Sequence, residues 1–135
     1  MKNLFLFLTI LSLSCMQNSK LISSKKIGLY QLGEKIPENF NKKIFDLTSD
    51  ENNIIVSIIV KSKEYKTKEG FGVGSNINTI QLSYKDSKKE PLTLSKGNTP
   101  FGSLGVKVTH NDILFVDNNN DNLVDFVWIE SFKKD

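Results

Sequence analysis

One stretch of this chain concentrates oxygen-bearing side chains at the spacing of a calcium-binding loop. It runs from residue 117 to residue 125 and reads Asp-Asn-Asn-Asn-Asp-Asn-Leu-Val-Asp. Relative positions 1, 3, 5 and 9 are filled by Asp117, Asn119, Asp121 and Asp125. Calcium takes six to eight oxygen ligands, several of them carboxylates. The spacing therefore makes calcium one hypothesis for this loop.

The same loop departs from a calcium loop at two positions. Position 6, which is usually glycine, is Asn122, and position 12, which is usually a bidentate glutamate, is Trp128. Asparagine and aspartate are also the ordinary residues of hairpin turns, because they tolerate left-handed backbone and bond to it. A hairpin turn is the other interpretation. We therefore expect no cofactor, with calcium as the alternative.

The remaining polar motifs lack the spacing or the partner residues of an active site. The glycines at 70, 72 and 74 have neither of the spacings that cradle phosphates, and all 18 basic residues are lysine, so no guanidinium is present for phosphate recognition. His110 is the sole histidine and has no second histidine or activated serine in its sequence context. Nothing places Asp121 and Asp125 across a cleft as an acid–base pair. We therefore expect a protein without catalytic activity.

Trp128 is the one aromatic side chain that we single out as a candidate interface residue, because strand aromatics often anchor protein contacts. Five further aromatics are expected in the core; they are Phe71, Tyr84, Phe101, Phe115 and Phe126.

The start of the chain indicates export. Lys2 precedes an apolar run from Leu4 to Leu13, which has the length of a signal-peptide core and is too short to span a bilayer. We predict a signal peptide at 1–14. Cys15, the only cysteine, follows Leu11-Ser12-Leu13-Ser14, and this resembles a bacterial lipobox. The resemblance implies lipidation of Cys15. Because Ser12 replaces the aliphatic residue of the strict pattern, ordinary cleavage after Ser14 is the alternative.

The composition of the mature chain limits its partners. Removing residues 1–14 from the 135-residue chain leaves 121 residues and lowers the net charge from +3 to +2, through the loss of Lys2. Such a nearly neutral balance gives no reason to expect nucleic-acid binding. We predict attachment to the membrane through the lipid, in the periplasm, at the outer membrane or on the cell surface. An envelope protein is the expected partner.

The patterning predicts a lipidated tether at 15–26 and a single α+β domain at 27–132. One hairpin is expected over residues 44–60, and a similar one recurs 69 residues later, over residues 113–129. A short helix is expected after Pro37 and another from Asn76 to Tyr84, with Ser75 as its N-cap. The prediction is a pseudo-duplicated domain, in which two short helices cover one face of a mostly antiparallel sheet.

A second, weaker resemblance rests on residues 66–75, with Ile80 and Tyr84 following. This segment resembles a motif of small secreted bacterial proteins of the β-lactamase-inhibitor-like and outer-membrane-assembly-lipoprotein type, although Lys85 stands where the motif has glycine. The resemblance implies a protein-binding or structural role. We therefore expect a non-catalytic, lipid-anchored envelope protein, with a calcium-binding envelope lipoprotein as the alternative.

Overall fold

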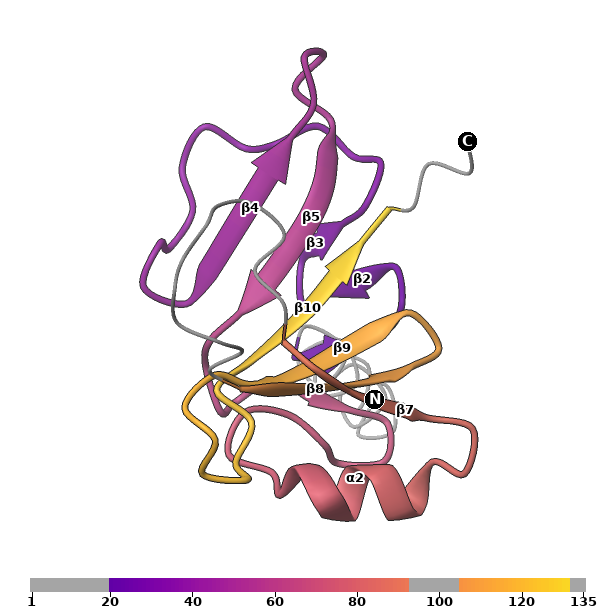
Figure 1. Cartoon of the computed structure of the whole chain (residues 1–135). Helices are drawn as coiled ribbons and strands as arrows, with labels where there is room; N and C mark the ends of the chain where they lie inside the picture. The colour runs from indigo at the N-terminus through magenta and orange to yellow at the C-terminus, as the bar shows by residue number, and fades with distance from the viewer. Residues whose placement is uncertain (1–19, 93–104, 132–135) are drawn as a thin grey trace, which may run out of the picture.

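The computed structural model describes residues 20–92 and 105–131, and it shows a mostly β protein. Figure 1 shows the described strands, which form two sheets, and the single described helix, α2 (Ile77–Ser83). The small sheet has the order β3-β2-β1-β6, and the large sheet has the order β4-β5-β10-β9-β8-β7. The expectation of an α+β domain with two helices is wrong. The predicted signal peptide, Cys15 and Phe101 lie outside the described residues.

The large sheet is antiparallel throughout and is built from hairpins. Its six strands, in chain order, are β4 (Phe45–Ser49), β5 (Ile55–Val60), β7 (Lys88–Pro91), β8 (Val106–His110), β9 (Ile113–Asp117) and β10 (Phe126–Glu130). Both hairpins of the predicted repeat are present, as β4–β5 and β9–β10. They join directly, because β10 pairs with β5 as well as with β9.

The helical part of the predicted repeat is absent from the described first half. After Pro37 the chain forms turns, in which Asn41 accepts hydrogen bonds at its side chain from the amide of Lys43 and at its carbonyl from those of Ile44 and Phe45. Asparagine favours such local bonds over a continuing helix. The second helix is confirmed, but its N-cap is Asn76, whose side chain accepts from the amides two and three residues on.

The small sheet begins earlier than expected. It comprises β1 (Leu21–Ile22), β2 (Lys26–Ile27), β3 (Tyr30–Gln31) and β6 (Lys66–Thr67), and β1 runs parallel to β6. Residues 20–26 belong to the predicted tether, because they are rich in serine and lysine. The structure instead buries Ile22, which is only 3% exposed, so the folded part starts before residue 27.

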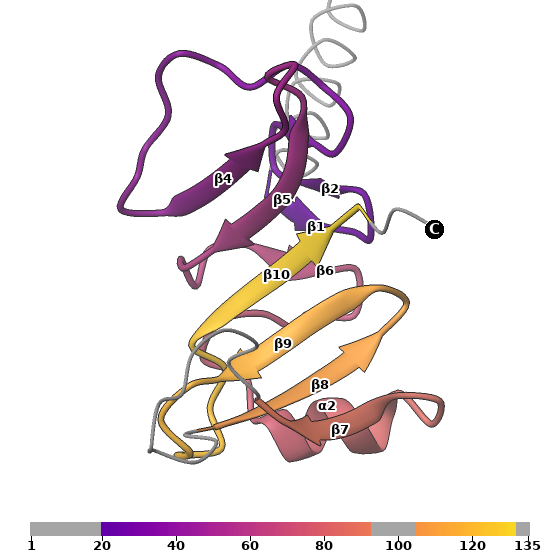
Figure 2. The same cartoon turned by 45° about the horizontal axis from the view of Figure 1, so that its top comes forward.

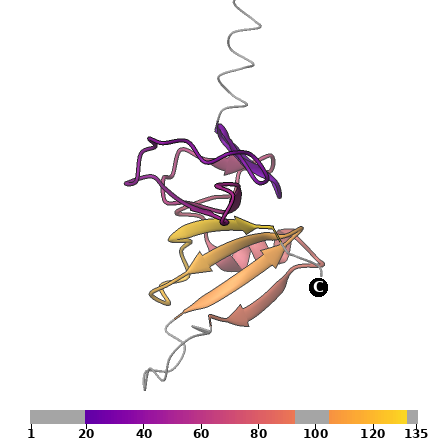
Figure 3. The same ribbon diagram turned by 90° about the horizontal axis from the view of Figure 1, so that it is seen from above.

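A single hydrophobic cluster joins the two sheets and the helix. Ile22 and Ile27 enter it from the small sheet, Ile77 and Ile80 from α2, and Phe115 from the centre of the large sheet. Figures 2 and 3 show α2 lying against β8 and β9, with which it makes contacts. The core therefore occupies one face of the large sheet. Among the described residues, no helix is long and apolar enough to cross a membrane.

Candidate functional sites

The 117–125 loop connects β9 to β10 and is organised by its own carboxylates. Asp117 is fully buried; its Oδ1 accepts a hydrogen bond from the amide of Asp121 at 3.3 Å, and its Oδ2 accepts one from the amide of Asn122 at 2.8 Å. Asp125 Oδ2 accepts from the amide of Asn118 at 2.6 Å. These bonds give the aspartates a structural role as acceptors inside a tight loop.

The same arrangement brings three carboxylates together. Asp117, Asp121 and Asp125 each offer an oxygen within 4.8 Å of the others. Asn122 adopts a left-handed backbone with φ of 67°, so it takes the conformation for which a calcium loop uses glycine. Asn119, the fourth predicted ligand, is exposed in the same loop, and no side-chain hydrogen bond is found for it within the described residues. Three of the four predicted residues thus converge.

Trp128 lies on the face of β10 that points away from the core. Side chains alternate along a strand, and Val127 and Ile129 both belong to the core cluster. Directly paired residues share a face, so Trp128 stands beside Ile59 of β5 and Leu114 of β9. Phe126 and Val116 form the next pair on this face. We call these five residues the Trp128 strip.

No member of the Trp128 strip belongs to the core cluster or is among the residues packed against it. Leu114 and Val116 are buried, whereas Ile59, Phe126 and Trp128 are partly exposed. The indole Nε1 of Trp128 donates a hydrogen bond to Ser57 Oγ at 2.8 Å. This bond satisfies the polar edge of the ring and fixes its orientation. Of the aromatics expected in the core, Phe115 lies there and Phe71 and Tyr84 pack against it, but Phe126 does not.

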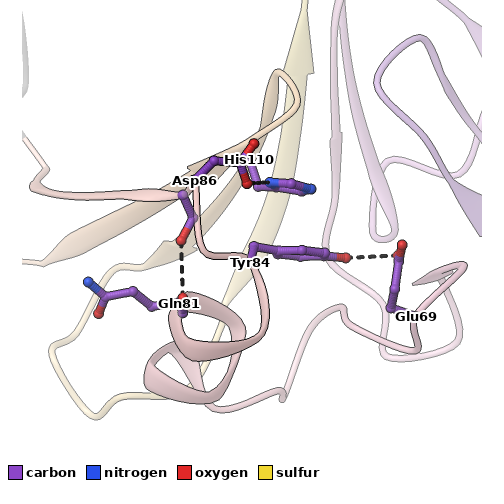
Figure 4. A network of polar contacts seen from close by, with 6 residues as sticks. Glu69, Gln81, Tyr84, Asp86 and His110 are labelled. Carbon is purple, nitrogen blue, oxygen red and sulfur yellow. Dashed lines mark hydrogen bonds and ion pairs between the residues drawn. The ribbon is translucent and has the colours of Figure 1, made fainter.

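Four polar side chains that sequence analysis did not connect meet between α2 and the β8–β9 turn. Figure 4 shows His110 stacked on Tyr84, with ring centroids 3.7 Å apart and planes 7° from parallel. His110 Nδ1 lies 3.1 Å from Asp86 Oδ1, an ion pair when the imidazole is protonated. The Tyr84 hydroxyl donates to Glu69 Oε2 at 2.8 Å. The partners of His110 are therefore Tyr84 and Asp86, which are distant from it in sequence.

The network also shifts two ionisation equilibria. Burial raises the pKa of Tyr84, and the hydrogen bond from Tyr84 lowers the pKa of Glu69. Tyr84, His110 and Glu69 line a small cavity of about 190 Å³ beside β1. These contacts connect three segments of the chain. Glu69 comes from the loop after β6, Tyr84 from the end of α2, and His110 from the end of β8.

The three glycines between β6 and α2 serve the backbone. Gly70 and Gly74 have positive φ values of 90° and 86°, which favour glycine. A side chain at Gly72 would collide with the carbonyl oxygen of Tyr65. These roles account for the glycine spacing without a phosphate.

Comparison of the chain with protein-family models, with curated proteins and with solved structures gives no match.

The Tyr84–Glu69 bond predicts a pH-dependent contribution to stability. Replacing Tyr84 with Phe removes the hydroxyl donor and should lower the free energy of unfolding near neutral pH by about 0.5–1 kcal/mol, because Glu69 is largely solvated. A carboxyl whose folded-state pKa is lowered stabilises the fold above its ordinary pKa of 4.5, and this contribution disappears as the pH falls through the folded-state pKa. The difference between wild type and Tyr84→Phe should therefore shrink in acid.

Urea unfolding monitored from about pH 7 to about pH 2 measures this difference. Tyr30→Phe is the matched control, since the Tyr30 hydroxyl makes no hydrogen bond within the described residues. If the difference in unfolding free energy between wild type and Tyr84→Phe stays constant down to the lowest pH, the hydrogen bond to Glu69 is not the source of that difference.

Proposed function

We propose that this chain is a lipid-anchored protein of a bacterial cell envelope that binds another protein and has no catalytic activity. The sequence supports the anchor through the predicted signal peptide at 1–14 and the lipobox-like context of Cys15. The observation that carries the binding role is the position of Trp128. It stands on the sheet face opposite the core, beside Ile59, with its indole nitrogen already bonded to Ser57.

Tryptophan suits this role for a physical reason. It offers a large apolar area with few rotatable bonds, so that little conformational entropy is lost when a partner covers it. Strands β5 and β10 hold the backbone around Trp128, and the bond to Ser57 restrains the ring. Ile59 and Phe126 extend the partly exposed apolar area on the same face. The surface is therefore preorganised for a partner with an apolar patch.

The direct test is photo-cross-linking in the native cells. The full chain would carry the photoreactive residue benzoylphenylalanine in place of Trp128, and a matched chain would carry it at Leu82, which is 82% exposed on α2. We expect the probe at 128, but not the one at 82, to cross-link one envelope protein. Combining the probe at 128 with Cys15→Ser should move the chain out of the membrane fraction and reduce that cross-link.

Two outcomes contradict this proposal separately. Cross-links from position 128 that join only residues of the chain itself would show that the Trp128 strip has no protein partner. A Cys15→Ser chain that stays in the membrane fraction would show that the anchor is not this cysteine.

A second candidate function is favoured by one observation, the convergence of the Asp117, Asp121 and Asp125 carboxylates within 4.8 Å. We propose calcium binding by this loop as the alternative, in which Asn119 would add a fourth oxygen ligand. Carboxylates and amide oxygens are the ligands that calcium prefers, and the left-handed Asn122 allows the sharp turn that such loops need. The hydrogen bonds within the loop would hold the ligands in place before the ion arrives.

Thermal unfolding with and without calcium tests this alternative. Calcium at about ten times its dissociation constant should add about 1.4 kcal/mol to the unfolding free energy, a rise in melting temperature of several degrees. Asp121→Ala should abolish the calcium-induced rise, whereas Glu51→Ala, in the exposed β4–β5 turn, should keep it. No rise at millimolar calcium would exclude calcium as a ligand.

A further inference from the structure

A groove of about 770 Å³ lies where β10 ends, next to the small cavity at Tyr84 and His110, with which it shares Ser24. Its walls come from the β1–β2 turn, the segment after β3, the start of β5, the β8–β9 turn and the last residues of β10. Figure 2 shows the tip of β10 between β2 and the β8–β9 turn. Grooves of several hundred Å³ are the size of ligand-binding sites. No residue of the Trp128 strip lines it.

The floor of the groove is apolar. Leu32, Ile54 and Val56 line it, and all three are partly exposed. The backbone beneath them is occupied: the Val56 carbonyl accepts from the amide of Ser131, and the carbonyl of Ile55 accepts from the amide of Gly33. An occupant must therefore bind through side chains, by placing an apolar group on this floor, rather than by adding a strand to β5.

The rim of the groove is acidic. Asp50, Asp112 and Glu130 line it against a single lysine, Lys25. In the described part of the chain none of these four residues forms a salt bridge, although other surface carboxylates do, such as Asp46 with Lys61 at 3.0 Å. Three carboxylates that have no ion-pair partner among the described residues therefore lie around an apolar floor. This combination favours a positively charged occupant with an apolar group.

We infer that this groove binds a peptide segment of a partner protein in which an apolar side chain is flanked by lysine or arginine. The apolar side chain covers Leu32, Ile54 and Val56, and the flanking cations lie against Asp112 and Glu130. The inference is independent of the Trp128 strip, because the two surfaces share no residue.

Fluorescence anisotropy of the full chain with two labelled hexapeptides tests the inference. One peptide alternates leucine with lysine, and the other alternates leucine with glutamate. We expect the lysine peptide to bind, the glutamate peptide not to bind, and the affinity for the lysine peptide to fall as salt is added.

Variants of the chain locate the binding. Asp112→Asn and Glu130→Gln should each weaken the lysine peptide about two- to fivefold, the range for exposed ion pairs. Asparagine tolerates the left-handed backbone at residue 112, where φ is 62°, so the fold is retained. Glu38→Gln, an exposed carboxylate outside the groove, makes the same charge change and should leave the affinity unchanged. Val56→Thr, which places a hydroxyl in the floor at nearly constant volume, should also weaken binding.

Four results would overturn the inference. The first is equal binding of the two peptides, and the second is an equal effect of Glu38→Gln and Glu130→Gln. The third is a lysine peptide that binds a chain truncated after Ser131 but does not bind the full chain. That result would mean that Phe132-Lys133-Lys134 of the full chain occupy the groove. If light scattering shows a dimer that Glu130→Gln dissociates and no peptide binds, the occupant is a second copy of the chain, which equally overturns it.

Discussion

The pairing of β10 with both β5 and β9 is the interaction on which the rest of the large sheet depends. Val127 lies between Val60 and Phe115, and Ile129 lies between Ile58 and Ile113. Strand β10 thereby links the β4–β5 hairpin to β9, which is far from it in sequence. Val127 and Ile129 of β10 pack in the core together with side chains of β5 and β9. Without this strand, β5 and β9 would each present an open edge, and the apolar residues of both hairpins would face water.

The same strand also positions the candidate functional surfaces. Alternation along β10 sends Val127 and Ile129 into the core and Trp128 to the opposite face. The loop that precedes β10 contains the three converging aspartates. Glu130, the last residue of β10, belongs to the acidic rim of the groove. A protein of this size thus displays three chemically different surfaces around one central strand: an apolar strip, a carboxylate cluster, and an apolar groove with an acidic rim.

Features with a local cause could be predicted from the sequence. The hairpins follow from apolar runs separated by Asn- and Asp-rich turns. The 77–83 helix follows from a polar segment before the apolar Ile77 and Ile80, although its cap is Asn76 and not the predicted Ser75. Features with a tertiary cause could not. β1 and β2 are two residues long each and lie in a polar segment, so only packing reveals them. The contacts of His110 with Tyr84 and Asp86 join segments that meet only when α2 packs on β8 and β9. The expected helix after Pro37 was wrong because propensity is weak against local turn bonding.

Amide hydrogen exchange tests the central role of β10 most directly. Because β10 is hydrogen-bonded on both sides, its amides should exchange only when the whole domain unfolds. The account predicts that Val127, Trp128 and Ile129 exchange most slowly, with an opening free energy equal to the unfolding free energy from urea. The amides of Lys88 and Lys89 in the edge strand β7 should exchange through local opening, with an opening free energy below that of global unfolding. If the amides of β10 exchange as fast as those of β7, the sheet is not organised around β10.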